Sequence, residues 1–173
     1  VVAGSWFRAT PSGTTANFFF HNEAGKTFSD QTDTFGLQNI MIVSAYTIVD
    51  FDRDGDLDFV TNSINGPLWL LRNNAQSGNS IAFRLHDELG NRDGIGTKFI
   101  IHYGPDGQRH QMRELKASGG YLSFDEPSAH FGLGEYDQVD RLEIHWSTGG
   151  RTDIPGTFAA GHVYSVHRSD TSD

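Results

Sequence analysis

Five aspartates stand at alternate positions in the stretch from residue 50 to residue 58, which reads Asp-Phe-Asp-Arg-Asp-Gly-Asp-Leu-Asp. Like charges this close repel one another unless a cation neutralises them. Hard oxygen ligands suit Ca²⁺ better than a transition metal. Asp50, Asp52 and Asp54 stand where a calcium loop has its first three carboxylates. Gly55 fills the position of the sharp turn.

The other two aspartates follow this glycine. We expect Asp56 to bind through its backbone carbonyl and Asp58 through a further carboxylate. The loop differs from an EF-hand, because Thr61 stands where the twelfth-position glutamate belongs. Residues 45–49 and 57–61, on either side, are rich in the β-branched and aromatic residues that favour strands. The sequence therefore predicts a calcium site between two strands; the alternative is an acidic surface turn that binds no ion.

The composition narrows the classes of function. A chain of 173 residues holds one large domain or two small ones. The net charge of −9 argues against binding to nucleic acid and against a polybasic membrane-surface patch. We expect no membrane span, because no apolar run is long enough. The absence of cysteine excludes disulfides, thiolate metal sites and a cysteine nucleophile. The chain begins Val-Val, with no signal peptide, so we expect a mature product or a piece of a longer protein.

The first half of the chain shows short strand signals. Residues 17–28 predict a hairpin with a turn at 22–26. Residues 18–22 and 69–73 share a pattern of three bulky apolar residues, a basic residue and Asn, 51 positions apart (73 minus 22). A repeat of this length is typical of a propeller blade or a related array. Chance similarity between two apolar strands is the alternative.

The polar stretch 75–80 is the expected boundary, which divides the chain into domains 1–76 and 77–173. Beyond it, strands are predicted at 81–86, 97–103, 108–116, 139–146 and 162–168, with a turn at 104–107. The strand 139–146 alternates, with Leu142, Ile144 and Trp146 on one face and Arg141, Glu143 and His145 on the other. No segment shows a sustained helical period. We therefore predict an all-β fold: a partial propeller-type β repeat with a calcium loop, followed by an antiparallel β-sandwich or barrel.

The calcium stretch and its flanking strands resemble the FG-GAP/VCBS repeat family. The resemblance covers the calcium core and the strand end Arg72-Asn73-Asn74, while the Gly-Ala-Pro element of that family is missing. It implies four side-chain ligands around the Gly55 turn: Asp50, Asp52, Asp54 and Asp58.

The second half resembles the ASPIC/UnbV domain, which follows such repeats in cartilage acidic protein-like and many bacterial secreted proteins. The motifs that carry the resemblance, in order, are Gly94-Ile95-Gly96, Ser118-Gly119-Gly120-Tyr121-Leu122-Ser123, His130-Phe131-Gly132-Leu133-Gly134 and Trp146-Ser147-Thr148-Gly149. Ser147 stands where that family often has Pro. The two resemblances together imply an extracellular or periplasmic module for adhesion or ligand binding, stabilised by Ca²⁺, with a glycan or protein partner and without catalysis.

Two other functions remain open: a secreted enzyme acting on polysaccharide through a carboxylate or His pair in the second half, and a purely structural cap of a β-propeller. His102 and His110 could face each other across the hairpin at 104–107. The candidate carboxylates are Glu88, Asp93, Glu114, Asp125 and Glu126, but sequence does not give their separation. We expect His130 to hydrogen-bond locally while Phe131 and Leu133 fill the core. No Gly-x-Ser-x-Gly nucleophile motif is present, and exposed aromatics such as Tyr121 could hold a sugar only by analogy of fold.

Overall fold

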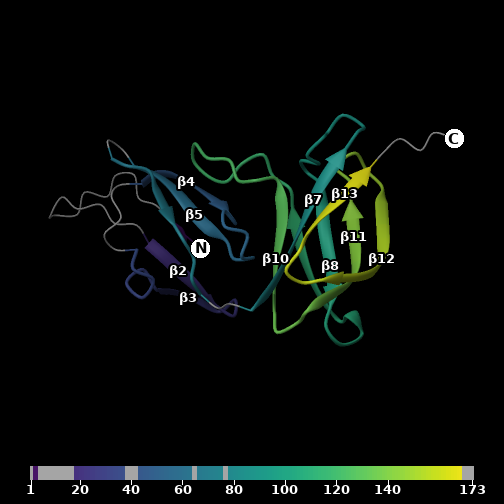
Figure 1. Ribbon diagram of the computed structural model, residues 1–173, viewed down its shortest axis with the longest axis horizontal. Coiled ribbons are helices and arrows are strands. Elements are labelled where there is room, and N and C mark those ends of the chain that lie inside the picture. Colours follow the sequence, from purple (N-terminus) through teal and green to yellow (C-terminus); the bar gives the residue numbers. More distant parts are fainter. Residues whose placement is uncertain (1, 4–17, 38–42, 64–65, 76–77, 169–173) are drawn as a thin grey trace. The chain divides into compact units, whose positions relative to one another are not determined.

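The computed structural model describes residues 2–3, 18–37, 43–63, 66–75 and 78–168, which form two compact units (Figure 1). The first unit comprises Val1–Val49, Asp58–Arg72 and Gly119–Phe124. The second comprises Asp50–Leu57, Asn73–Ser118 and Asp125–Asp173. The predicted sequence division between residues 76 and 77 stays a prediction, because the two units are defined by packing and each combines separate stretches of chain.

The described residues form strands and one short 3-10 helix, which confirms the all-β prediction. No helix among them is long and apolar enough to cross a membrane. The strands are β1 Val2–Ala3, β2 Phe18–Glu23, β3 Thr27–Asp30, β4 Val43–Val49, β5 Asp58–Ser63, β6 Trp69–Leu71, β7 Asn79–Asp87, β8 Lys98–Tyr103, β9 Arg109–Glu114, β10 Ser128–Gly134, β11 Gln138–His145, β12 Arg151–Ala159 and β13 Val163–Arg168, and the 3-10 helix η1 is Pro105–Gly107.

The first unit holds two antiparallel three-stranded sheets, β1-β2-β3 and β4-β5-β6. The predicted hairpin is confirmed as β2 and β3, and Asn22 Oδ1 accepts a hydrogen bond of 2.7 Å from the Gly25 N–H in its turn. The strands predicted on either side of the acidic stretch are β4 and β5. Their register pairs Val49 with Asp58, so the two ends of the acidic stretch meet at the end of this pair of strands.

The second unit is a two-layer β-sandwich, which confirms that prediction and excludes the closed barrel. One layer is the three-stranded sheet β10-β7-β13 and the other is the four-stranded sheet β12-β11-β8-β9. All neighbouring strands in these layers are antiparallel except β13, which runs parallel to β7. The first and last strands of the sandwich are therefore hydrogen-bonded neighbours, and this pairing ties its two ends together.

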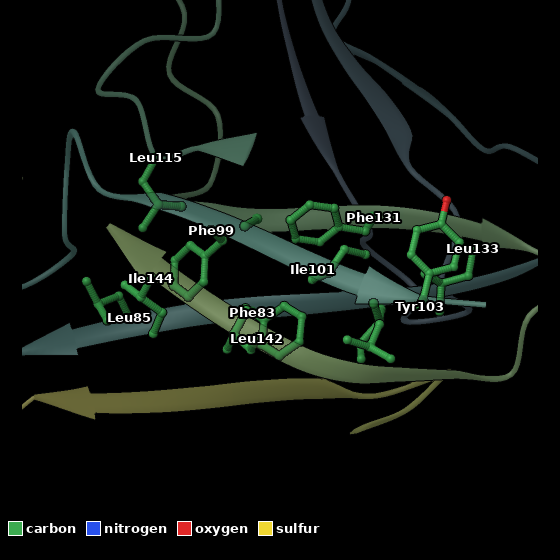
Figure 2. Close-up of a cluster of buried hydrophobic side chains, with 13 residues drawn as sticks. Phe83, Leu85, Phe99, Ile101, Tyr103, Leu115, Phe131, Leu133, Leu142 and Ile144 are labelled. Carbon is green, nitrogen blue, oxygen red and sulfur yellow. The ribbon is translucent and has the colours of Figure 1, made fainter. Parts of the chain in front are cut away.

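Alternating apolar residues of both layers fill the space between them (Figure 2). On β11 the predicted inward residues Leu142 and Ile144 are fully buried, whereas Trp146, just after the strand, is half-buried. Phe83 of β7 lies at the centre of the core, fully buried. Its ring centroid lies 5.6–6.2 Å from four other aromatic rings, which are those of Phe99, Phe131, Phe158 and Tyr164.

Two strands of the sandwich were absent from the sequence prediction. The motif His130–Gly134 lies in β10, where Phe131 and Leu133 are buried, as predicted. The register of β10 against β7 shifts between the two glycines of this motif, Gly132 and Gly134. Strand β12 was missed because Pro155 and Gly156 interrupt its pattern; β12 is an edge strand, and proline is tolerated in such strands.

Replacing the central aromatic residue tests this core. Phe83→Ala removes a fully buried ring and leaves a cavity, so we expect the free energy of unfolding to fall by roughly 3–5 kcal/mol. Met112→Ala on β9 is the control: its side chain is 48% exposed, and we expect a change within about 0.5 kcal/mol. Urea denaturation measures both. Equal effects of the two substitutions would contradict the assignment of this core.

Candidate metal centre

The acidic stretch forms the connection between β4 and β5, and it gathers carboxylates. Asp50, Asp52 and Asp58 each offer an oxygen within 4.8 Å of the oxygens of the other two. Asp58 is fully buried, Asp50 is half-buried and Asp52 is exposed. In the part of the chain that the structure describes, this is the one such group of three or more acidic or histidine side chains. Three of the five predicted residues are therefore brought together.

The other two predicted residues lie outside this group. The Asp54 carboxylate accepts a hydrogen bond of 3.0 Å from the Asp56 N–H, which closes a local turn. Asp56 was expected to bind through its backbone carbonyl, a role that stays a prediction. The predicted set of ligands is thus a tight group of three carboxylates with two further aspartates in the same short loop.

The two carboxylate oxygens of Asp50 differ in their hydrogen bonding. Asp50 Oδ1 is buried without a hydrogen-bond partner, while Asp50 Oδ2 accepts a hydrogen bond of 3.1 Å from the Gly55 N–H. A buried carboxylate oxygen with no donor is unfavourable, because it has lost water and gained nothing in exchange. Two carboxylates about this far apart also repel each other by on the order of 3 kcal/mol at an effective dielectric constant of 20. A bound cation would relieve both costs, and an all-oxygen donor set suits a hard cation such as Ca²⁺. The residues present therefore fit the predicted ion.

The turn of the loop is held by the sandwich, a contact that the sequence did not predict. The Gly55 carbonyl accepts a hydrogen bond of 2.7 Å from Ser80 Oγ, and His130 Nε2 lies 2.9 Å from the same oxygen. The expectation that His130 bonds locally is therefore wrong, because its partner lies 75 positions away in the sequence. No local pattern could show this contact, since it depends on how the loop folds back onto β7 and β10.

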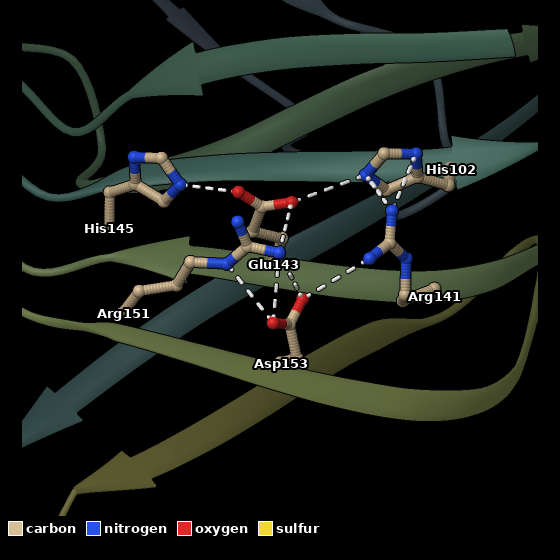
Figure 3. Close-up of polar contacts among 6 residues, drawn as sticks. All are labelled: His102, Arg141, Glu143, His145, Arg151 and Asp153. Atoms are coloured by element: carbon tan, nitrogen blue, oxygen red, sulfur yellow. Dashed lines mark hydrogen bonds and ion pairs between the residues drawn. The ribbon is translucent and has the colours of Figure 1, made fainter.

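A second polar cluster lies on the outer face of the sheet β12-β11-β8-β9 and is centred on Glu143 (Figure 3). Glu143 lies on the face of β11 opposite the core residues, as the alternation predicts, yet it is only 7% exposed. Basic side chains cover its carboxylate: His145 Nε2 contacts Oε1, and Arg151 Nη2 lies 3.3 Å from Oε2. His102 Nε2 lies 3.5 Å from Oε2. Covering by these neighbours, rather than by the core, accounts for the burial.

These contacts make Glu143 a poor acid catalyst. The hydrogen bond with His145, followed by the charge of Arg151 and the hydrogen bond with His102, holds the pKa of Glu143 below its ordinary value of 4.5 despite burial, which acts the other way. A general acid needs the opposite shift. Salt bridges to Arg151 and Arg141 also engage the neighbouring carboxylate of Asp153. The cluster is best explained as the neutralisation of a buried charge.

An open pocket of about 530 Å³ adjoins the cluster, and five polar or charged residues and two glycines line it. It is formed by His102, Gly104, Asp106, Gly107, Gln138, Asp140 and Arg141. As predicted, His102 faces His110 across the hairpin, with ring centroids 6.3 Å apart. Two of the candidate carboxylates form salt bridges instead of a pair: Glu126 with Arg84, and Asp93 with Arg92 at 3.4 Å. The pocket therefore provides polar groups for a ligand, and none of the five candidate carboxylates lines it.

Acid titration tests the role of Glu143. Its folded-state pKa is lowered, so ionised Glu143 stabilises the fold above about pH 4.5, and this stability is lost as the pH falls through the lowered pKa. We expect the difference in unfolding free energy between wild type and Glu143→Gln to shrink from about pH 5 to about pH 2. His102, His145 and Arg151 contact this carboxylate, and Arg141 and Asp153 lie beside them; the hydrogen bond with Arg151 lowers the pKa of Asp153 as well.

Glu114→Gln on β9 is the control, because Glu114 is exposed. The difference in unfolding free energy between this variant and wild type should vary little between about pH 5 and about pH 2. Urea denaturation at each pH measures both differences. A Glu143→Gln difference that does not depend on pH would contradict the role assigned to the carboxylate.

Comparison with known sequences relates the second half of the chain to a protein family. The profile of the family described as "ASPIC and UnbV" matches residues 87–173. The chain is 30% identical over 122 residues to cartilage acidic protein 1 of Homo sapiens, covering 69% of this chain and 18% of that protein. It is also 30% identical over 133 residues to cartilage acidic protein 1 of Xenopus tropicalis, covering 72% of this chain and 20% of that protein.

The relatives are therefore much longer than this chain, which spans about a fifth of their length. The family match includes β8 to β13 and so most of the sandwich. Since the matched stretch makes up half of the sequence, the chain belongs to the ASPIC and UnbV family.

Proposed function

We propose that this chain is a calcium-stabilised extracellular binding module. The observation that carries the proposal is the convergence of Asp50, Asp52 and Asp58, together with the buried and unpartnered Asp50 Oδ1. Asp54 and Asp56 are proposed to complete the ligand set. Bound calcium supplies positive charge to the carboxylates and links the end of β4 to the start of β5. We further propose that the stretch containing this loop is an FG-GAP/VCBS-like repeat, as its sequence resembles one.

An extracellular or periplasmic location is part of the same proposal. The matched relatives carry the name cartilage acidic protein, and this chain shares an acidic character, with a net charge of −9. Millimolar calcium outside cells is matched to loops of modest affinity. The proposed ligand is a glycan or a protein. Its candidate contact in the second unit is the open pocket beside His102, and a separate candidate in the first unit is the exposed side chain of Tyr121.

Calcium removal tests the metal proposal. An ion that binds only the folded protein stabilises it by about 2.7 kcal/mol at a free concentration one hundred times Kd. For a chain of this size, that stabilisation corresponds to a rise in Tm of roughly 5–11 °C. We expect EDTA to lower the Tm by this order and added calcium to restore it. Asp50→Asn should abolish most of the difference, because it removes the charge of the carboxylate whose Oδ1 has no partner.

The control for this substitution is Asp106→Asn, the same chemical change at an exposed position in a turn. We expect Asp106→Asn to keep the full calcium-dependent shift. Asp54→Ala tests whether the fourth carboxylate belongs to the ligand set, and we expect it too to remove most of the shift. Differential scanning calorimetry measures all four proteins. Identical melting curves of the wild type with calcium and with EDTA would refute the metal proposal.

A purely structural role is the second candidate, and a specific observation favours it. Large apolar side chains of the first unit are exposed, among them Leu68 at 65% and Phe28 at 58%. A contiguous patch of such side chains would be a surface on which another protein packs. A glycan array probed with the chain separates the candidates. Calcium-dependent binding to particular glycans supports the binding module, whereas no binding to any glycan or candidate protein supports the structural role.

A further inference from the structure

The backbone of Gly55 connects the acidic loop with the sandwich through its N–H and its carbonyl. On one side, the Gly55 N–H donates to Asp50 Oδ2 at 3.1 Å. On the other, the Gly55 carbonyl receives Ser80 Oγ at 2.7 Å and His130 Nε2 at 2.9 Å. All these groups belong to the second compact unit, which includes the loop segment Asp50–Leu57. A candidate metal ligand and two sandwich side chains are thus joined through a single residue.

Ser80 and His130 are placed by neighbouring strands. The pairing of β7 with β10 sets His130 opposite Ala82 and Ser80 opposite Gly132. Ile81 and Phe131, next to them in sequence, are buried in the core. Since side chains alternate along a strand, those of Ser80 and His130 stand on the outer face of the same sheet. Their positions are therefore set by the packing of the core beneath them.

The Gly55 carbonyl determines which groups donate in this contact. A carbonyl oxygen only accepts hydrogen bonds, so the hydroxyl of Ser80 donates, and Nε2 of His130 must carry a hydrogen. The two donors together use both lone pairs of the Gly55 oxygen.

Glycine is required at the centre of this contact for two reasons. Gly55 has a φ of +94°, a backbone conformation that residues with a side chain rarely adopt. A Cβ at this position would also lie 2.8 Å from Ser80 Oγ. The glycine that the sequence assigns to the calcium turn is therefore also the residue that lets the sandwich approach the loop backbone.

We propose that Ser80 and His130 are positioning residues of the calcium loop. By holding the Gly55 carbonyl, they fix the backbone of the turn whose N–H donates to the Asp50 carboxylate, so the calcium affinity of the loop depends on β7 and β10. This inference rests on the proposed calcium site and adds to it the role of the histidine in the motif His130–Gly134. Groups that hold metal ligands in place through hydrogen bonds raise the affinity for the metal, because less conformational entropy is lost when those ligands bind it.

Calcium titration of variants tests the proposal. Ser80→Ala and His130→Ala each remove one donor to the Gly55 carbonyl. A lost hydrogen bond of about 1 kcal/mol corresponds to a Kd for calcium weakened by roughly 3- to 10-fold. His130→Gln keeps an N–H donor on a side chain of similar reach, and we expect it to restore part of the affinity. Isothermal titration calorimetry with calcium chloride measures Kd, and Tm in EDTA reports the stability of the calcium-free protein.

Matched controls separate positioning from general destabilisation. His110→Ala and Ser165→Ala make the same chemical changes at exposed positions of the sandwich, and we expect their Kd to equal that of the wild type. A purely structural role of Ser80 and His130 would lower the Tm in EDTA and in calcium alike while leaving Kd unchanged, and that result overturns the inference. If His130→Ala does not fold, Ser80→Ala and His130→Gln still decide it. A wild-type protein that binds no calcium would instead refute the proposed function on which the inference rests.

Discussion

Electrostatic repulsion within one short loop is the constraint on which this account depends. Asp50, Asp52 and Asp58 lie with oxygens within 4.8 Å of one another, and Asp58 is fully buried. Buried charges persist in proteins when they are paired, hydrogen-bonded or bound to a metal. At Glu143 the basic side chains of Arg151, His102 and His145 surround the carboxylate. The buried Oδ1 of Asp50 has no donor, and we propose a divalent cation as its neutralising partner.

The sandwich gives this loop a rigid support. Phe83 of β7 packs against Phe99 and Phe158 of the opposite sheet, and β7 also carries Ser80, which donates to the loop. Other family motifs also serve packing. Asn91 Nδ2 donates to the Ile95 carbonyl at 2.8 Å and to Ser147 Oγ at 3.0 Å, which connects the motif at 94–96 with the motif at 146–149. These motifs therefore have a structural role in the sandwich that does not depend on a ligand.

Local sequence patterns predicted the strands and buried faces, because these features depend on residues close together in the chain. The alternation that ends at Leu142 and Ile144 indicated the buried face of β11, and the β-branched residues around the acidic stretch indicated β4 and β5. Long-range contacts were beyond such patterns. The burial of Glu143 depends on Arg151 and His102 from neighbouring strands, and the bond from His130 to Gly55 depends on loop packing. The acidic spacing likewise predicted which residues belong to the loop, but only the fold shows that Asp50, Asp52 and Asp58 are the three that converge.

The most direct test of the central claim is a crystal structure of this chain grown with calcium and examined by anomalous scattering. The account predicts a peak among the carboxylates of Asp50, Asp52 and Asp58, with oxygens at about 2.3–2.6 Å from the ion. It also predicts that Asp50 Oδ1, which has no hydrogen-bond donor, binds the ion directly. Ordinary water at this position, with the carboxylates turned away from one another, would contradict the account.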